Sequence, residues 1–209
     1  MPKIKDLLIC VLFGLCVFIF FINKSNVDKI NALEFENKAL SIENEILNRK
    51  YDEACQGLRD KQLHHVIGYY SIKPNSKIDR DTLYSFLNRH RDVFHFPDII
   101  YAQVVLESGV GNSSLYGRSN NLVGMGYATS RETTATGKTD GGFATYKNWQ
   151  MCVLDRPLWD NMMFKNRKPT RAEYIAKLKQ SYATDPKYID RINHIILTDY
   201  NKRCRKNRL

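Results

Sequence analysis

Hydrophobic and polar positions divide the chain into stretches with different patterns. An uncharged apolar run covers residues 7–22, and a mostly polar stretch with apolar residues at seven-residue spacing follows it. Beyond residue 76, apolar residues recur at the spacing of short amphipathic helices. This pattern predicts a membrane anchor over residues 1–26, a coiled-coil stalk over 27–62, a linker over 63–75 and a globular domain over 76–209.

The apolar run 7–22 is the candidate membrane segment. A helix of that length spans about 24 Å, short of the ~30 Å hydrocarbon core. Lys5 and Lys24 flank the run and can extend the span by snorkelling. A cleaved signal peptide is the alternative, but no small-residue cleavage site follows the run. We therefore expect an uncleaved, single-pass anchor, which the nearly even flanking charge does not orient.

The polar stretch that follows fits a heptad repeat. One core position is taken by Ile30, Asn37, Asn44, Tyr51 and Leu58, and the other by Leu33, Leu40, Leu47 and Ala54. Leucine at the second position with asparagine at the first is typical of a parallel two-stranded coiled coil. The sequence therefore predicts a parallel homodimer. The alternative is a single amphipathic helix packed on the next domain.

The remainder predicts a mainly helical α+β domain with a small β-hairpin lobe. Gly, Thr and Asp-Gly-Gly turn signals place the hairpin between residues 122 and 146. Capping boxes are expected at Ser76–Asp79 and at Thr170–Glu173. Helices are expected after Asp79, over Pro97–Ser108, over Trp149–Phe164, from Thr170 to about Tyr182, and from Asp185-Pro186 to about Asp199.

Charge and cysteine content limit which partners and which kinds of site are expected. The net charge of +10 favours an anionic partner, such as a cell wall or lipid headgroups. Helix-turn-helix, zinc-finger and RNP-type signatures are absent from the sequence, so nucleic acid is not expected as a partner. The five cysteines form no CxxC pair, and we expect no metal site, no disulfide framework and no cofactor.

One carboxylate, Glu107, lies where an apolar helix ends and a Gly- and Asn-rich turn begins. This position is between the helical part and the hairpin lobe, where a cleft is expected. Partial burial there would raise the pKa of Glu107, and a carboxyl that stays protonated near neutral pH can act as a general acid. The alternative is an ordinary surface charge at a helix end.

A series of motifs favours the catalytic interpretation. "VLESGVG", "NNLVGM", "FATY" and "YATDPKY" occur in this order within residues 96–192. The series resembles the bacterial glucosaminidase family, glycoside hydrolase family 73. The resemblance implies a lysozyme-like α+β fold and hydrolysis of the β-1,4 bond after N-acetylglucosamine in peptidoglycan.

The resemblance also implies roles for particular residues. Glu107 matches the catalytic acid, and Tyr182 matches a motif tyrosine that contacts the reacting sugar. Substrate contacts are expected from Asn120, Asn121, Tyr127, Tyr146, Trp149 and Tyr188. Both asparagines can alternatively cap the turn, and the hairpin aromatics can alternatively belong to the core.

The sequence offers more than one candidate for a second catalytic group. Glycosidases ordinarily use two carboxylates. Glu132 in the hairpin is the candidate second carboxylate, with Asp140 as the other acidic residue of the lobe. Without it, the acetamido group of the substrate can serve as nucleophile, or Tyr182 can help to hold a water.

A peptidoglycan hydrolase would place the catalytic domain outside the cytoplasm and the amino end inside. Two alternatives stay open at this stage. One is a lytic transglycosylase or muramidase on the same fold that uses Glu107 alone. The other is a wall-binding scaffold without catalysis, in which the coiled coil serves to link the membrane to the wall.

Overall fold

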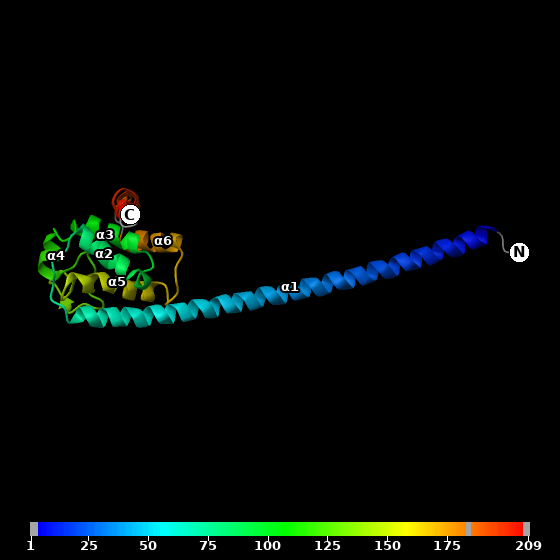
Figure 1. The fold of residues 1–209 in the computed structure, drawn as a ribbon, viewed down its shortest axis with the longest axis horizontal. Coiled ribbons are helices and arrows are strands. Elements are labelled where there is room, and N and C mark those ends of the chain that lie inside the picture. Colours follow the sequence, from blue (N-terminus) through cyan, green and yellow to red (C-terminus); the bar gives the residue numbers. More distant parts are fainter. Residues whose placement is uncertain (1–3, 183–184, 207–209) are drawn as a thin grey trace. The chain divides into compact units, whose positions relative to one another are not determined.

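A computed structural model of the chain describes residues 4–182 and 185–206, apart from the side chains at 4–14, 16–17, 19–22, 25, 28 and 182. The chain forms two compact units, Met1–Tyr51 and Asp52–Leu209. Helix α1, Ile4–Ser71, supplies the first unit and continues into the second (Figure 1). The candidate catalytic residues all belong to the second unit.

The first unit is helical throughout its described residues. The apolar heptad residues Ile30, Leu33, Leu40 and Leu47 are exposed in the single chain. The coiled-coil homodimer stays a prediction. Among the described residues, no helix combines the length and hydrophobicity needed to cross a membrane. Most side chains of the predicted anchor, 7–22, lie outside the described part, so the anchor also stays a prediction.

The end of α1 differs from the linker expected over residues 63–75. The helix continues to Ser71, and the side chains of Leu63 and Val66 are buried in the hydrophobic core of the second unit. Leu63, Val66 and Tyr70 recur at helical spacing, and this apolar face packs on the domain. Burial of that face outweighs the cost of about 1 kcal/mol for Gly68 within a helix.

Short helices make up most of the second unit. After α1 they are α2 (Arg80–Arg89), the 3-10 turn η1 (Arg91–Val93), α3 (Pro97–Ser108), α4 (Ser114–Ser119), α5 (Trp149–Met163), α6 (Arg171–Tyr182), α7 (Tyr188–Ile195), the π-helical turn η2 (Ile196–Tyr200) and α8 (Asn201–Lys206). The predicted helix Pro97–Ser108 is confirmed, with Pro97 in its first turn. The capping box before α6 is also confirmed, because Thr170 N donates to Glu173 Oε2 and Glu173 N donates to Thr170 Oγ1.

Two helix ends differ from the sequence prediction. The N-cap of α2 is Asp79, whose carboxylate accepts from Thr82 N, so the capping box expected from Ser76 does not form. Ser76 Oγ instead accepts from the indole nitrogen of Trp149. The last helical segment continues to Lys206, past the end expected near Asp199.

The predicted hairpin lobe is present and small. Strand β1 (Gly137–Lys138) pairs antiparallel with β2 (Ala144–Thr145), with Gly137 opposite Thr145. A further antiparallel bridge joins Gly126 to Phe143. The mainly helical α+β architecture predicted from the sequence is therefore observed in the second unit.

Helix α3 lies at the centre of this unit. It contacts α2, α7 and η2, and its residues from Ile99 to Val104 are buried on all sides. Figure 1 shows α3 next to α2 in this unit. A helix that is apolar around its whole circumference is typical of a core position. The core therefore holds α3 firmly and fixes the place of its last turn, where Glu107 lies.

Candidate active site

The last turn of α3 presents Glu107 at the point where the chain leaves the helix. Gly109 caps the helix in the left-handed conformation, with φ of 55°, and donates its N–H to Val105 O. Gly111 follows with φ of 87°, and a Cβ there would lie 2.8 Å from Ile78 Cγ2. The two glycines thus allow a sharp exit that leaves Glu107 uncovered by the following chain.

Glu107 lines a cavity of about 630 Å³. The walls come from the N-terminal part of α4, the segment Asn121–Gly126 with Ala128, Phe143 of the hairpin, and Trp159 of α5. The volume lies within the range of small-molecule binding pockets. Among the described residues that line it, Glu107 is the sole carboxylate and Arg131 the sole cation.

The surroundings of Glu107 favour its protonated form. The residue is exposed to the cavity, but protein atoms around the carboxyl partly desolvate it and raise its pKa above the ordinary 4.5. A hydrogen bond from Tyr188 of α7 opposes this rise by stabilising the carboxylate. Tyr188 is itself buried, and its hydroxyl accepts a 3.0 Å hydrogen bond from Gln103 Nε2.

Asn120 and Asn121 organise the turn between α4 and the hairpin. Asn120 caps α4 in the left-handed conformation, and its amide donates to Tyr146 O. Asn121 is fully buried and donates to Met125 O and Ala144 O, while its Oδ1 accepts from Met125 N. Both amides therefore bond to the backbone, the capping role that the sequence analysis left open. Asn121 also lines the cavity, so its contribution to substrate binding stays a prediction.

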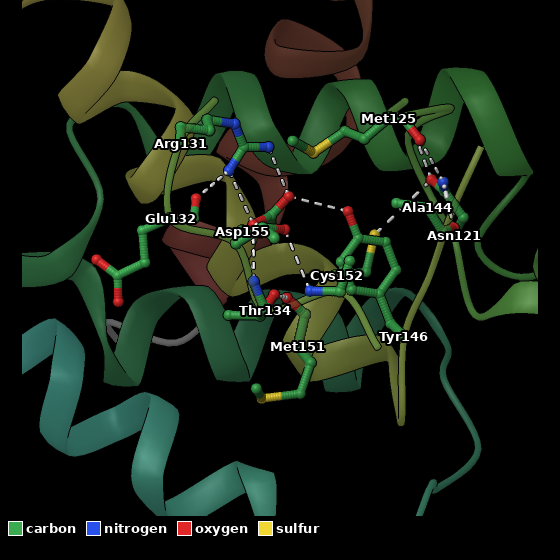
Figure 2. Close-up of polar contacts among 12 residues, drawn as sticks. Asn121, Met125, Arg131, Glu132, Thr134, Ala144, Tyr146, Met151, Cys152 and Asp155 are labelled. Carbon is green, nitrogen blue, oxygen red and sulfur yellow. Dashed lines mark hydrogen bonds and ion pairs between the residues drawn. The ribbon is translucent and has the colours of Figure 1, made fainter. Parts of the chain in front are cut away.

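A buried ion pair fixes the segment that precedes the hairpin. Arg131 donates from both Nη atoms to Asp155 of α5, at 3.0 and 2.8 Å. Asp155 also accepts from Thr133 Oγ1, Thr134 N and the Tyr146 hydroxyl (Figure 2). Such a bidentate, fully bonded pair holds the wall of the cavity at Arg131 in one geometry.

Glu132, the expected second carboxylate, does not line the cavity. Its Oε1 lies 3.5 Å from His64 Nδ1 of α1, and both side chains are more than half exposed. Figure 2 shows the Glu132 side chain extending away from the Arg131–Asp155 pair. The cavity in this structure therefore contains one candidate catalytic carboxylate among the described residues, not the pair expected from the sequence.

A comparison with family models identifies the family of the chain. The family model for Glucosaminidase, described as mannosyl-glycoprotein endo-beta-N-acetylglucosaminidase, matches residues 87–201, more than half of the chain. The chain belongs to the glucosaminidase family. The resemblance inferred from the motif series is thereby confirmed.

Other comparisons add less. Among solved structures, the catalytic domain of the autolysin Auto from Listeria monocytogenes is similar, with 22% identity, a TM-score of 0.36, and coverage of 67% of this chain and 85% of that chain. No curated protein matches the chain.

The aromatic residues expected to bind substrate occupy different places in this glucosaminidase domain. Tyr146 is buried and bonds Asp155, and Trp149 is buried with its indole nitrogen on Ser76. These two side chains pack in the core, the alternative named for the hairpin aromatics, and do not line the cavity. Tyr127 is exposed beside the cavity segment. The side chain of Tyr182 lies outside the described residues, although its neighbour Ser181 lines the cavity.

Three residues at the glucosaminidase site were not identified from the sequence. Gln103 bonds to Tyr188, while Arg131 and Trp159 line the cavity. The sequence offered a weak indication for Gln103. It is a polar residue among apolar residues of α3, and it lies four positions before Glu107. Arg131 and Trp159 had no such indication, because only the fold brings them to the same cavity.

Proposed function

We propose that this protein hydrolyses peptidoglycan at the β-1,4 bond after N-acetylglucosamine, with Glu107 as the general acid. The observation that carries the proposal is a partly desolvated carboxyl that lines a cavity of about 630 Å³, on a chain of the glucosaminidase family. Because its pKa is raised by desolvation, Glu107 holds its proton to higher pH than an ordinary glutamic acid, and it can deliver that proton to the glycosidic oxygen.

The cavity favours one route for the rest of the reaction. Because no second described carboxylate lines it, the 2-acetamido group of the substrate is the candidate nucleophile. Its carbonyl oxygen attacks the anomeric carbon as the glycosidic bond breaks, and the leaving sugar takes the proton from Glu107. Water then opens the resulting oxazolinium ion, and Glu107 accepts a proton from that water, which restores the acid.

Product analysis tests this proposal directly. The full chain, in mild detergent, is incubated with purified peptidoglycan, and the new glycan ends are identified by mass spectrometry. The proposal expects reducing N-acetylglucosamine ends. Reducing muramic ends or anhydro-muramic ends would instead assign a muramidase or a lytic transglycosylase on the same acid. Binding of glycan without any new ends would assign a scaffold.

The first unit supplies the basis for a proposal on assembly. We infer that residues 30–51 pair with a second copy of the chain in a parallel coiled coil. The apolar heptad residues are exposed in the single chain, and Asn37 and Asn44 can pair with their counterparts across the axis. In the same proposal, residues 7–22 anchor the dimer, with the amino end cytoplasmic and the catalytic domain outside. Membrane fractionation combined with protease accessibility of the intact cell surface tests that orientation.

A further inference from the structure

Gln103 is a buried polar residue in an otherwise apolar part of α3. Its side chain has no exposed surface, and it lies four residues before Glu107, so both project from the same side of the helix. Gln103 Nε2 donates to the Tyr188 hydroxyl at 3.0 Å, and the Tyr188 side chain in turn acts on the Glu107 carboxyl, whose pKa it lowers. The three side chains therefore form one chain of hydrogen bonds that ends at the carboxyl in the cavity.

The chemistry of the three groups sets the direction of this chain. An amide nitrogen donates and does not accept, so the Tyr188 oxygen must accept from Gln103. The single hydroxyl proton of Tyr188 is then free to point at Glu107. An ionised carboxylate only accepts, which matches a tyrosine that donates. A donor on its oxygen also polarises the tyrosine hydroxyl and strengthens the bond to Glu107.

We propose that Gln103 is a positioning residue for the reaction: it fixes the Tyr188 hydroxyl as a donor to one oxygen of Glu107, and so leaves the other oxygen to carry the transferable proton toward the cavity. The inference rests on the proposed role of Glu107 as the acid. It assigns a function to a residue that does not itself contact the cavity.

The other end of the same amide predicts that Gln103 lowers stability rather than raising it. Gln103 Oε1 is buried and has no hydrogen-bond partner among the described residues. A buried acceptor without a partner is costly, and an apolar side chain of similar volume would avoid that cost. A residue that stabilised the core only through packing would not need this amide.

Few other charged groups are placed to change the pKa of Glu107. Among the described residues that line the cavity, Arg131 is the sole other charged group, and it is paired with Asp155. On the elements packed against α3, Asp199 of η2 is paired with Arg80 and Arg203. The charged and titratable side chains on α7 are Asp190, Arg191 and His194, which are exposed to solvent, as is Lys187 at its N-cap. Tyr188 is therefore the principal polar partner of the Glu107 carboxyl.

The test substitutes Gln103→Met, which keeps the volume and removes the donor. The full chain is labelled with ¹³C at the glutamate side-chain carboxyl, and the Glu107 signal is assigned by its loss in Glu107→Gln. Titration of that signal follows the Glu107 pKa whether or not the protein cleaves glycan, so failure of the proposed function is recorded separately. The thermal unfolding midpoint and the initial rate on peptidoglycan are measured on the same samples.

We expect Gln103→Met to raise the Glu107 pKa, to keep or raise the unfolding midpoint, and to lower the rate about tenfold or more. Tyr188→Phe should raise the Glu107 pKa further, and adding Gln103→Met to Tyr188→Phe should cause no further rise, because both act through one hydroxyl. The control, Ile100→Val on the same helix, removes packing alone and should leave the Glu107 pKa unchanged.

Two outcomes would overturn the inference. One is a folded Gln103→Met variant whose Glu107 pKa is that of the wild type. The other is an equal rise in the presence and absence of Tyr188→Phe. If Gln103→Met does not fold, Gln103→Leu takes its place, because it too removes the donor to the Tyr188 hydroxyl and should raise the Glu107 pKa. An unmoved Glu107 signal in a folded Gln103→Leu variant would also overturn the inference.

Discussion

Glu132 pairs with His64 of α1, with Oε1 3.5 Å from Nδ1, and its side chain is absent from the walls of the cavity that holds Glu107. The hairpin carboxylate and the candidate acid therefore do not form the facing pair of an ordinary two-carboxylate glycosidase. Exposed pairs of this kind contribute about 0–1 kcal/mol, so the contact alone does not hold the segment in place.

Glu132→Gln should accordingly retain a rate within about tenfold of the wild type, since a group outside the cavity supplies less than the 10²–10⁴-fold of a general acid or base. Initial rates of glycan-end formation measure this. Asp140→Asn, at the exposed tip of the hairpin, is the matched control. A loss as large as that of Glu107→Gln would show instead that the segment moves and brings Glu132 to the substrate.

Glu107→Gln should stabilise the protein at neutral pH. Because the pKa of Glu107 is raised in the folded state, folding favours the protonated carboxyl. That stabilisation is complete below the unfolded-state pKa and is lost as the pH rises through the folded-state pKa. The variant, neutral at every pH, should therefore unfold at a higher temperature than the wild type at pH 7, and the gap should close near pH 3. A gap that widens on acidification would contradict the raised pKa.

Asp155→Asn should destabilise the second unit by about 3–5 kcal/mol, because it leaves the Arg131 guanidinium buried without its counter-charge. Denaturant unfolding followed by tryptophan fluorescence measures the change, since Trp149 and Trp159 lie on the same helix as Asp155. Asp92→Asn, in an exposed pair with Arg91, serves as the control and should shift the midpoint little. Equal effects of the two substitutions would show that the buried network does not support the fold.

Leu40→Asp should convert the proposed dimer to a monomer, because a charge at a core heptad position is buried on pairing. Sedimentation equilibrium of the full chain in density-matched detergent measures the mass. Glu45→Ala, at an outer heptad position, should leave the mass unchanged. A monomeric wild type, or a Leu40→Asp variant that keeps the mass of a dimer, would rule out pairing through this face.

The sequence predicted those parts of the fold that local chemistry determines. Pro97 and Gly109 bound α3 because one suits the first turn of a helix and the other suits its left-handed cap. The Thr170–Glu173 box and the hairpin turn are likewise local. Glu107 was placed correctly at the end of a helix, and its raised pKa followed from expected burial.

Long-range contacts were not predictable in the same way. The Ser76 hydroxyl accepts a hydrogen bond from the Trp149 indole and does not cap α2, although its spacing to Asp79 suits a capping box. Tyr146 is an aromatic residue of the kind that can stack on a sugar, but its hydroxyl donates a hydrogen bond to the buried Asp155. The role of Gln103 depends on Tyr188, which lies 85 positions away and reaches it only through the packing of α7 on α3.

The central claim is that Glu107 is the acid of a glycan hydrolase, and the rate of Glu107→Gln on purified peptidoglycan tests it most directly. The variant is nearly isosteric and cannot donate an acidic proton. We predict a fall in the rate of reducing-end formation of about 10²–10⁴-fold, with the fold and glycan binding retained. A Glu107→Gln variant that produces glycan ends at the wild-type rate would contradict the account.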